Sequence, residues 1–172
     1  MLQILGSSPA GHEGPVELLL ACHGRIRSFT SLAARLASDE AAADADIAEA
    51  ARRVHRYHAV ALPLHQADEE LSIAPRLEGG SLSGPLAAMK KEHLELDLVL
   101  AGLLPLWEQL GAEPGRRGEL SPRMSQEVAR MQALWTRHLA AEEELIFPAL
   151  GRLPDLARIV EEMRARRVPS GR

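Results

Sequence analysis

Apolar residues recur at intervals of three and four along most of the chain, the pattern of amphipathic helices. Four long stretches follow it, over residues 15–37, 47–71, 85–110 and 121–147. A shorter amphipathic stretch covers about 155–167. Pro63 and Pro105 lie inside two of the long stretches, and we predict a bend at each because proline removes a helical hydrogen bond.

This pattern predicts an all-α protein, an antiparallel up-down four-helix bundle with a short fifth C-terminal helix. A chain of 172 residues is long enough for one domain with its own core. The scarcity of aromatic residues, 3% of the chain, also favours helices over sheets. We expect a flexible N-terminal lead over 1–14, the bundle over 15–150, and an amphipathic helix and tail over 151–172.

An internal repeat underlies this organisation. Each copy has a lone histidine on one helix and a His-x-x-x-Glu motif on the next. The residues are His23, His65 and Glu69 in the first copy, and His93, His138 and Glu142 in the second. The chain is therefore predicted to consist of two similar helical hairpins.

These residue types at this spacing favour a metal site. Residues four apart lie one above the other on a helix, so each His-x-x-x-Glu presents an imidazole and a carboxylate together. Imidazole nitrogen with carboxylate oxygen suits iron, manganese or zinc, and six ligands call for two ions. The two carboxylates leave residual positive charge, which a bridging oxo or hydroxo group or a small exogenous ligand would offset. We therefore expect open coordination positions that oxygen, peroxide or nitric oxide can reach.

The alternative is that these motifs lie on exposed helices, where a single His-x-x-x-Glu is common. Two matched copies, each with an upstream histidine, favour the metal site. The histidines are flanked by expected core residues such as Leu20, Ile26 and Leu96. Six unpaired polar groups in such a core would destabilise it, so the pattern favours polar groups that bind an ion.

The combined motif resembles the hemerythrin-like (HHE cation-binding) family, whose pattern is His, His-x-x-x-Glu, His, His-x-x-x-Glu over four helices. The resemblance covers about residues 16–150. It implies a non-haem di-iron cofactor. It also implies that His23, His65, His93 and His138 are terminal ligands, and that Glu69 and Glu142 bridge two iron ions.

Within that family, the chain is less similar to oxygen-carrying hemerythrins than to proteins of iron-centre repair or iron sensing. The oxygen carriers have a second histidine four residues after the one on the third helix, where this chain has Asp97. Their fourth-helix carboxylate lies five residues after its histidine, whereas Glu142 lies four after His138.

The resemblance implies a protein that binds or senses oxygen or nitric oxide, or that handles iron under oxidative or nitrosative stress. Two alternatives stay open at this point. One is a di-iron enzyme that consumes peroxide or reduces nitric oxide. The other is a metal-free helical interaction module, against which the presence of all six candidate ligands argues.

Four more residues predict a polar pocket beside the metals. Arg27 and Asp97 each lie four residues beyond a candidate ligand, and we expect an ion pair or a hydrogen-bonded link between them. His58 and Met131 each lie seven residues before a candidate ligand, at the same level. The pocket would be an access site that hydrogen-bonds a diatomic ligand. Alternatively, the polar pair serves packing only, or Asp97 is a further metal ligand.

Net charge and cysteine content exclude some classes of partner and of covalent cross-link. A net charge of −4 gives no general attraction to phosphates, so we expect no nucleic-acid partner. Cys22 is the only cysteine, which excludes an internal disulfide. We find no basic leader and no long apolar run, so we expect a cytoplasmic protein without a membrane partner. The expected partner is a small diatomic ligand, and the chain is expected to be a monomer or a weak homo-oligomer.

Overall fold

The structure, a computed structural model, describes residues 14–38 and 42–168. Residues 1–13 of the predicted N-terminal lead lie outside these ranges. Within them every regular element is helical, as predicted, and the helices form a bundle. The elements are α1 (Pro15–Ser38), α2 (Asp44–Arg56), η1 (Tyr57–Ala61), α3 (Leu62–Ala67), η2 (Asp68–Ile73), α4 (Ala74–Leu77), η3 (Gly80–Leu82), α5 (Ser83–Ala112), η4 (Pro114–Arg116), α6 (Arg117–Ala141), η5 (Glu142–Ile146), α7 (Phe147–Leu150) and α8 (Leu156–Ala165).

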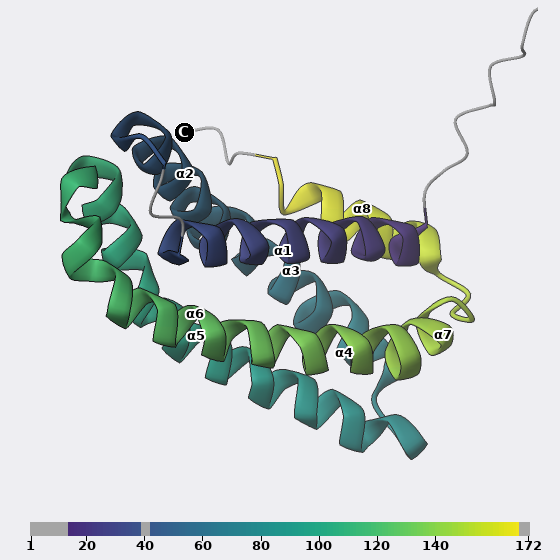
Figure 1. The fold of residues 1–172 in the computed structure, drawn as a ribbon. Helices are drawn as coiled ribbons and strands as arrows, with labels where there is room; N and C mark the ends of the chain where they lie inside the picture. The colour runs from purple at the N-terminus through teal and green to yellow at the C-terminus, as the bar shows by residue number, and fades with distance from the viewer. Residues whose placement is uncertain (1–13, 39–41, 169–172) are drawn as a thin grey trace, which may run out of the picture.

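The long helices pack side by side (Figure 1). Helix α1 contacts α6 and α2, and α5 contacts α6 and α2. The short helix α8 packs against α1 and η2. None of the helices in the described ranges is both long enough and apolar enough to cross a membrane.

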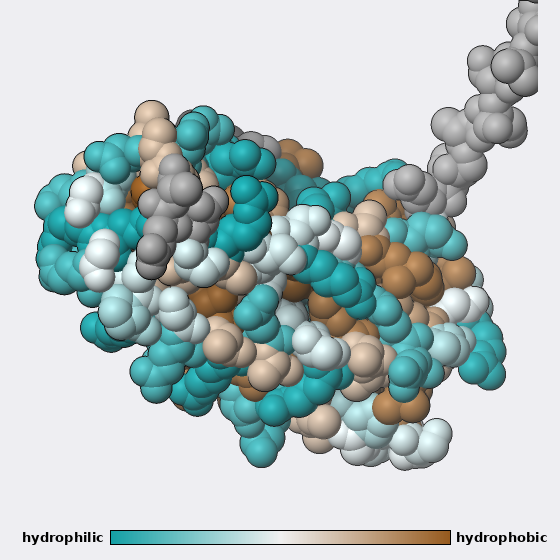
Figure 2. All heavy atoms as spheres, viewed as in Figure 1, coloured by the Kyte–Doolittle hydropathy of each residue, from teal (hydrophilic) through white to brown (hydrophobic). Residues whose placement is uncertain are grey.

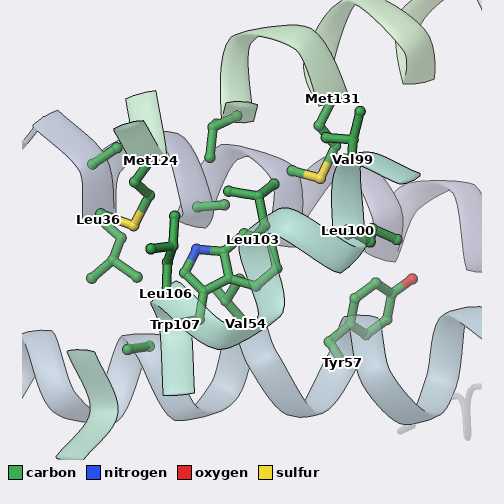
Figure 3. Close-up of a cluster of buried hydrophobic side chains, with 14 of the residues drawn as sticks. Leu36, Val54, Tyr57, Val99, Leu100, Leu103, Leu106, Trp107, Met124 and Met131 are labelled. Carbon is green, nitrogen blue, oxygen red and sulfur yellow. The ribbon is translucent and has the colours of Figure 1, made fainter. Parts of the chain in front are cut away.

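Two apolar clusters fill the bundle, with a polar layer between them. The larger cluster surrounds Trp107, whose ring lies among Leu103, Leu106 and Val54 (Figure 3). The smaller cluster includes Leu19 and joins α8 to the rest of the bundle. On each ligand-bearing helix the candidate histidine lies between the two clusters; in α1, for example, His23 lies between Leu19 and Ile26. Apolar packing above and below therefore shields the polar layer from water.

Three π-helical segments interrupt the second and fourth long stretches, and the spacing of apolar residues does not predict them. In each, one backbone amide donates to the carbonyl five residues earlier: Leu62 to Tyr57, Ala74 to Glu69 and Phe147 to Glu142. The residue after each donor is a proline, namely Pro63, Pro75 or Pro148. In an α-helix a proline ring collides with the carbonyl four residues earlier, and the wider π turn relieves that collision. Two of these turns begin at or beside the candidate ligands Glu69 and Glu142.

Helix boundaries differ from the prediction at several points. The second stretch begins at Asp44 and stays helical to Leu77 instead of ending near residue 71. Helix α5 extends through Pro105 to Ala112, slightly past the predicted end at residue 110, and α6 begins at Arg117, upstream of the Pro122 expected at its start.

The face shown in Figure 2 is dominated by hydrophilic side chains, with hydrophobic residues gathered toward the end where α1 begins. Leu20, expected in the core, is 45% exposed. It follows Leu19, which is fully buried and takes the inward position on this turn of α1.

Candidate metal centre

Six polar side chains from four helical segments meet in the layer between the two apolar clusters. None is more than 2% exposed. They are His23 from α1, His65 from α3, Glu69 at the start of η2, His93 from α5, His138 from α6 and Glu142 at the start of η5. The structure therefore brings together all six residues that the repeat singled out.

These side chains form two overlapping groups, each with four candidate ligand atoms within 4.8 Å of one another. Position A consists of His23 and His65, position B of His93 and His138, and both positions share Glu69 and Glu142. Glu69 Oε1 lies 3.1 Å from His65 Nε2, and Glu69 Oε2 lies 3.2 Å from His93 Nε2. The Glu69 carboxylate thus directs one oxygen to each position.

Glu142 repeats this arrangement from the other copy. Its Oε2 lies 3.2 Å from His23 Nε2, and its Oε1 lies 3.3 Å from His138 Nε2. Neighbouring ligand atoms are expected about 3 Å apart around an ion with bonds of about 2.1 Å at right angles. Each position therefore has two imidazoles from one copy and one carboxylate oxygen from each copy.

The hydrogen-bonding state of these atoms fits a metal. The four imidazole Nε2 atoms and the four oxygens of Glu69 and Glu142 are all buried and lack a hydrogen-bond partner within the described ranges. Buried polar atoms without partners are strongly destabilising unless something else satisfies them. Nitrogen and oxygen donors without a thiolate suit iron, manganese or zinc, so the residues fit the cofactor that the sequence predicts.

A second set of carboxylates contacts the outer side of the histidines. The pairs are His23 Nδ1 with Glu143 Oε1 at 2.7 Å, His93 Nδ1 with Glu70 Oε1 at 2.7 Å, and His138 Nδ1 with Glu92 Oε2 at 3.0 Å. Each carboxylate accepts from Nδ1–H, so in the neutral ring Nε2, which is directed at the centre, is the nitrogen free to bind a cation. The spacing of the six central residues does not predict these positioning residues. The doubled glutamate in each motif was the available signal for Glu70 and Glu143, since the second glutamate occurs in both copies.

The pKa values of the central histidines differ. Burial lowers their pKa values, but at His23 the neighbouring carboxylates, led by Glu142, outweigh it and raise the pKa to about 10. At His93 the carboxylates, led by Glu69, raise the pKa to about 9. Burial prevails at His65, where the pKa falls to about 4. A cation that binds here must displace protons from His23 and His93, because only an unprotonated nitrogen coordinates a metal.

The two shared carboxylates also differ in pKa. Burial would raise the pKa of Glu69, but the surrounding histidines, led by His65, lower it. Burial and the like charge of Glu69 raise the pKa of Glu142 to about 8. Two buried carboxylates this close compete for the same positive charge, so one of them holds a proton until a cation supplies that charge.

The predicted link between Arg27 and Asp97 does not form. Arg27 Nη2 donates to Glu143 Oε1 at 2.8 Å, and Asp97 is exposed and accepts from Gln66 Nε2 at 3.2 Å. The inward positions are the third residues after the ligand histidines, Ile26 and Leu96, which are fully buried. Arg27 and Asp97 are the fourth residues after the ligands, and their side chains are exposed. Asp97 is likewise absent from both candidate ligand groups.

His58 and Met131 are buried, but in the larger apolar cluster rather than in a polar pocket. His58 packs on Trp107 with ring centroids 5.0 Å apart, and its Nδ1 donates to the carbonyl of Val54 at 2.9 Å. Met131 packs near Val99 (Figure 3). A pocket of about 300 Å³ lies between α1 and α6, with Arg27, Trp135 and Leu139 in its lining, but none of the six central side chains lines it.

Comparison with known proteins agrees with this geometry. No curated protein matches the chain. A family model for the hemerythrin HHE cation-binding domain matches residues 14–150, most of the chain and all six side chains of the centre. The chain therefore belongs to the hemerythrin HHE cation-binding domain family.

Proposed function

We propose that this protein holds a non-haem di-iron centre at positions A and B and uses it to bind or sense a small diatomic ligand, or to handle iron under oxidative or nitrosative stress. The observation that supports two ions is the orientation of Glu69 and Glu142, each of which directs one oxygen to either position. Four protein ligands at each position are fewer than an octahedral ion takes, so open positions remain for a ligand.

Bound iron would supply redox activity and an open coordination position for a diatomic molecule. The protein residues have three tasks. The four histidines and two glutamates hold and space the ions, and the outer carboxylates orient three of the imidazole rings. Leu19 and Ile26, with the clusters to which they belong, exclude bulk water from the layer.

We also propose that the four long segments run up, down, up and down. Two contacts support opposite directions for neighbouring segments. Arg117, at the start of α6, donates to the carbonyl of Leu36 near the end of α1 at 3.2 Å. Arg52, early in the second segment, donates to the carbonyl of Gly111 near the end of α5 at 2.8 Å.

The test of the centre is iron analysis of protein purified without oxygen in the presence of ferrous iron, together with Mössbauer spectroscopy. We expect two irons per chain and the spectrum of a coupled pair. His93→Ala should lower the iron content, whereas His55→Ala, which alters a half-buried histidine outside the centre, should leave it unchanged. An iron content below one per chain in the unaltered protein would overturn the proposal.

Rapid mixing of the ferrous protein with oxygen or nitric oxide tests the proposed use. A spectrum that changes once and then stays constant is the expected result for binding or sensing. Continuous consumption of the gas over many equivalents would show an enzyme and would overturn the sensing role while leaving the iron site intact.

A further inference from the structure

The outer contacts of the four histidines are not equal. Within the described ranges, His65 is the one candidate ligand whose Nδ1 atom is buried without a hydrogen-bond partner. Its counterpart in the second copy, His138, has Nδ1 3.0 Å from a carboxylate oxygen of Glu92. The two copies are therefore alike in the atoms that face the ions and unlike one step further out.

The two copies of the repeat differ at the position that supplies this carboxylate in the second copy. Glu92 immediately precedes His93, and the residue that immediately precedes His23 is Cys22. In the repeat, Cys22 therefore takes the place of Glu92. Cys22 is 7% exposed, and its Sγ accepts from Arg25 Nη2 at 3.0 Å. A thiol stands in the first copy where the second has a carboxylate.

An outer carboxylate on a ligand histidine has two effects on metal binding. It fixes the ring and the tautomer so that Nε2 faces the ion, and it makes Nε2 a stronger donor. Position B has this support on both of its histidines, His93 and His138. Position A has it on His23 alone. Loss of one such partner typically lowers metal affinity about 10–100-fold.

We propose that the two cation positions are inequivalent, that position B fills first, and that position A is the weaker site because the Nδ1 atom of His65 has no carboxylate partner within the described ranges. This inference rests on the proposed di-iron function and adds its regulation. At low iron supply the chain holds one ion at position B. The pair, and with it any chemistry that needs two ions, forms only when supply is high enough to fill position A.

Repulsion between two ions would make the second ion bind more weakly than the first even if the two positions were identical. The test therefore measures the affinity of each position with the other one disabled. His65→Ala removes a ligand from position A alone, and His138→Ala removes one from position B alone. Affinity for the first Fe(II) is measured without oxygen by competition with a coloured chelator. We expect His65→Ala to keep the first-ion affinity of the unaltered protein, and His138→Ala to lower it by about 10–100-fold.

Substitutions at Glu92 and Cys22 provide the second part of the test. Glu92→Gln should weaken the first binding step about 10–100-fold, and Cys22→Glu should strengthen the second step by a similar factor. Cys22→Ser is the matched control, since it stays small and uncharged and should change neither step. Where Cys22→Glu does not fold, Glu92→Gln, at a partly exposed position, still decides the matter.

The outcomes separate the two proposals. If the unaltered protein binds no Fe(II), the di-iron function fails. If it binds two ions but His65→Ala and His138→Ala have equal first-ion affinities, the function stands and the inequivalence is overturned.

Discussion

The two segments that carry the His-x-x-x-Glu motifs have different surroundings on their outer side. In the first copy α8 packs on η2, where the fully buried Asp68 accepts from Arg166 Nη1 at 2.7 Å and from Arg167 Nη2 at 2.6 Å. In the second copy the equivalent residue is Ala141, and Leu145, in the place of Ser72, is 49% exposed.

The contacts of α8 extend along η2. Ser72 Oγ donates to Glu162 Oε2 at 2.7 Å and accepts from Arg166 Nη2 at 2.6 Å. Arg76 Nη2 donates to Glu162 Oε1 at 2.8 Å, and the second copy has Ala149 in the place of Arg76. Matching ligand geometry therefore occurs with and without this polar network, so the spacing of the ligand atoms does not require the contacts with α8.

The sharpest test of equivalence at the centre is the pair Glu69→Ala and Glu142→Ala. Because each carboxylate directs an oxygen to both positions, either change should weaken both ions, each by more than about 100-fold, beyond the effect of losing an outer partner. Iron analysis and Fe(II) competition measure this. If one variant loses a single ion and the other loses both, the carboxylates do not share their roles equally.

A smaller effect is expected from His58→Met, which places in the first copy the residue found at Met131 in the second. Burial lowers the pKa of His58 to about 4 from an ordinary value of 6.5. Between pH 6.5 and pH 4 the unfolded chain takes up a proton at this residue and the folded protein does not. The contribution of neutral His58 to the free energy of unfolding is therefore fully present above pH 6.5. About 3 kcal/mol of it is lost as the pH drops to 4.

Urea unfolding of both proteins at pH 7 and pH 4.5 measures this contribution. His58→Met should lose less stability on acidification than the unaltered protein. Equal losses in the two proteins would show that His58 takes up its proton without unfolding and that its burial has no role in the pH response.

The next largest effect on stability is expected from the hydrogen bonds that Asp68 accepts from Arg166 and Arg167, just after α8. Asp68→Ala, which matches Ala141, removes two charge-assisted hydrogen bonds, and we expect unfolding to become easier by about 2 kcal/mol. The loss is limited because Arg166 and Arg167 are partly exposed and can be hydrated. In urea unfolding, Glu49→Ala is the control, since the exposed Glu49–Arg53 pair at 4.0 Å should contribute less than about 0.5 kcal/mol. Similar small changes in both variants would show that α8 is held by apolar packing alone.

The smallest effect is expected from Leu145→Ser, which gives the second copy the residue type of Ser72. An exposed leucine outside the core should change the free energy of unfolding by no more than about 0.5 kcal/mol. A loss above about 1 kcal/mol in the same urea experiment would show that Leu145 is covered in solution and that the two copies are more alike than the structure indicates.

The sequence was sufficient to predict the helices and the six central residues because both depend on spacing along one helix. Ile26 and Leu96 are apolar and lie three residues after His23 and His93, which indicates that these are the inward positions. The neighbouring positions of Arg27 and Asp97 then face outward, which argues against a pair between them. The contact of Glu92 with His138 joins residues 46 apart, and that of Arg166 with Asp68 joins residues 98 apart. No local periodicity indicates such contacts, since they depend on how far a side chain reaches across the packed bundle.

The prolines after the π segments have a consequence for metal uptake. A helix that has gained one residue in a turn could in principle rewind, but Pro75 and Pro148 have no amide hydrogen to give to an α-helical bond. The covalent chain itself thus fixes the rotation of everything beyond Glu69 and Glu142 relative to the histidine before them. Glu70 and Glu143 lie within these turns, so the carboxylates that orient His93 and His23 are in place before an ion arrives, and binding loses little conformational entropy in arranging those two rings.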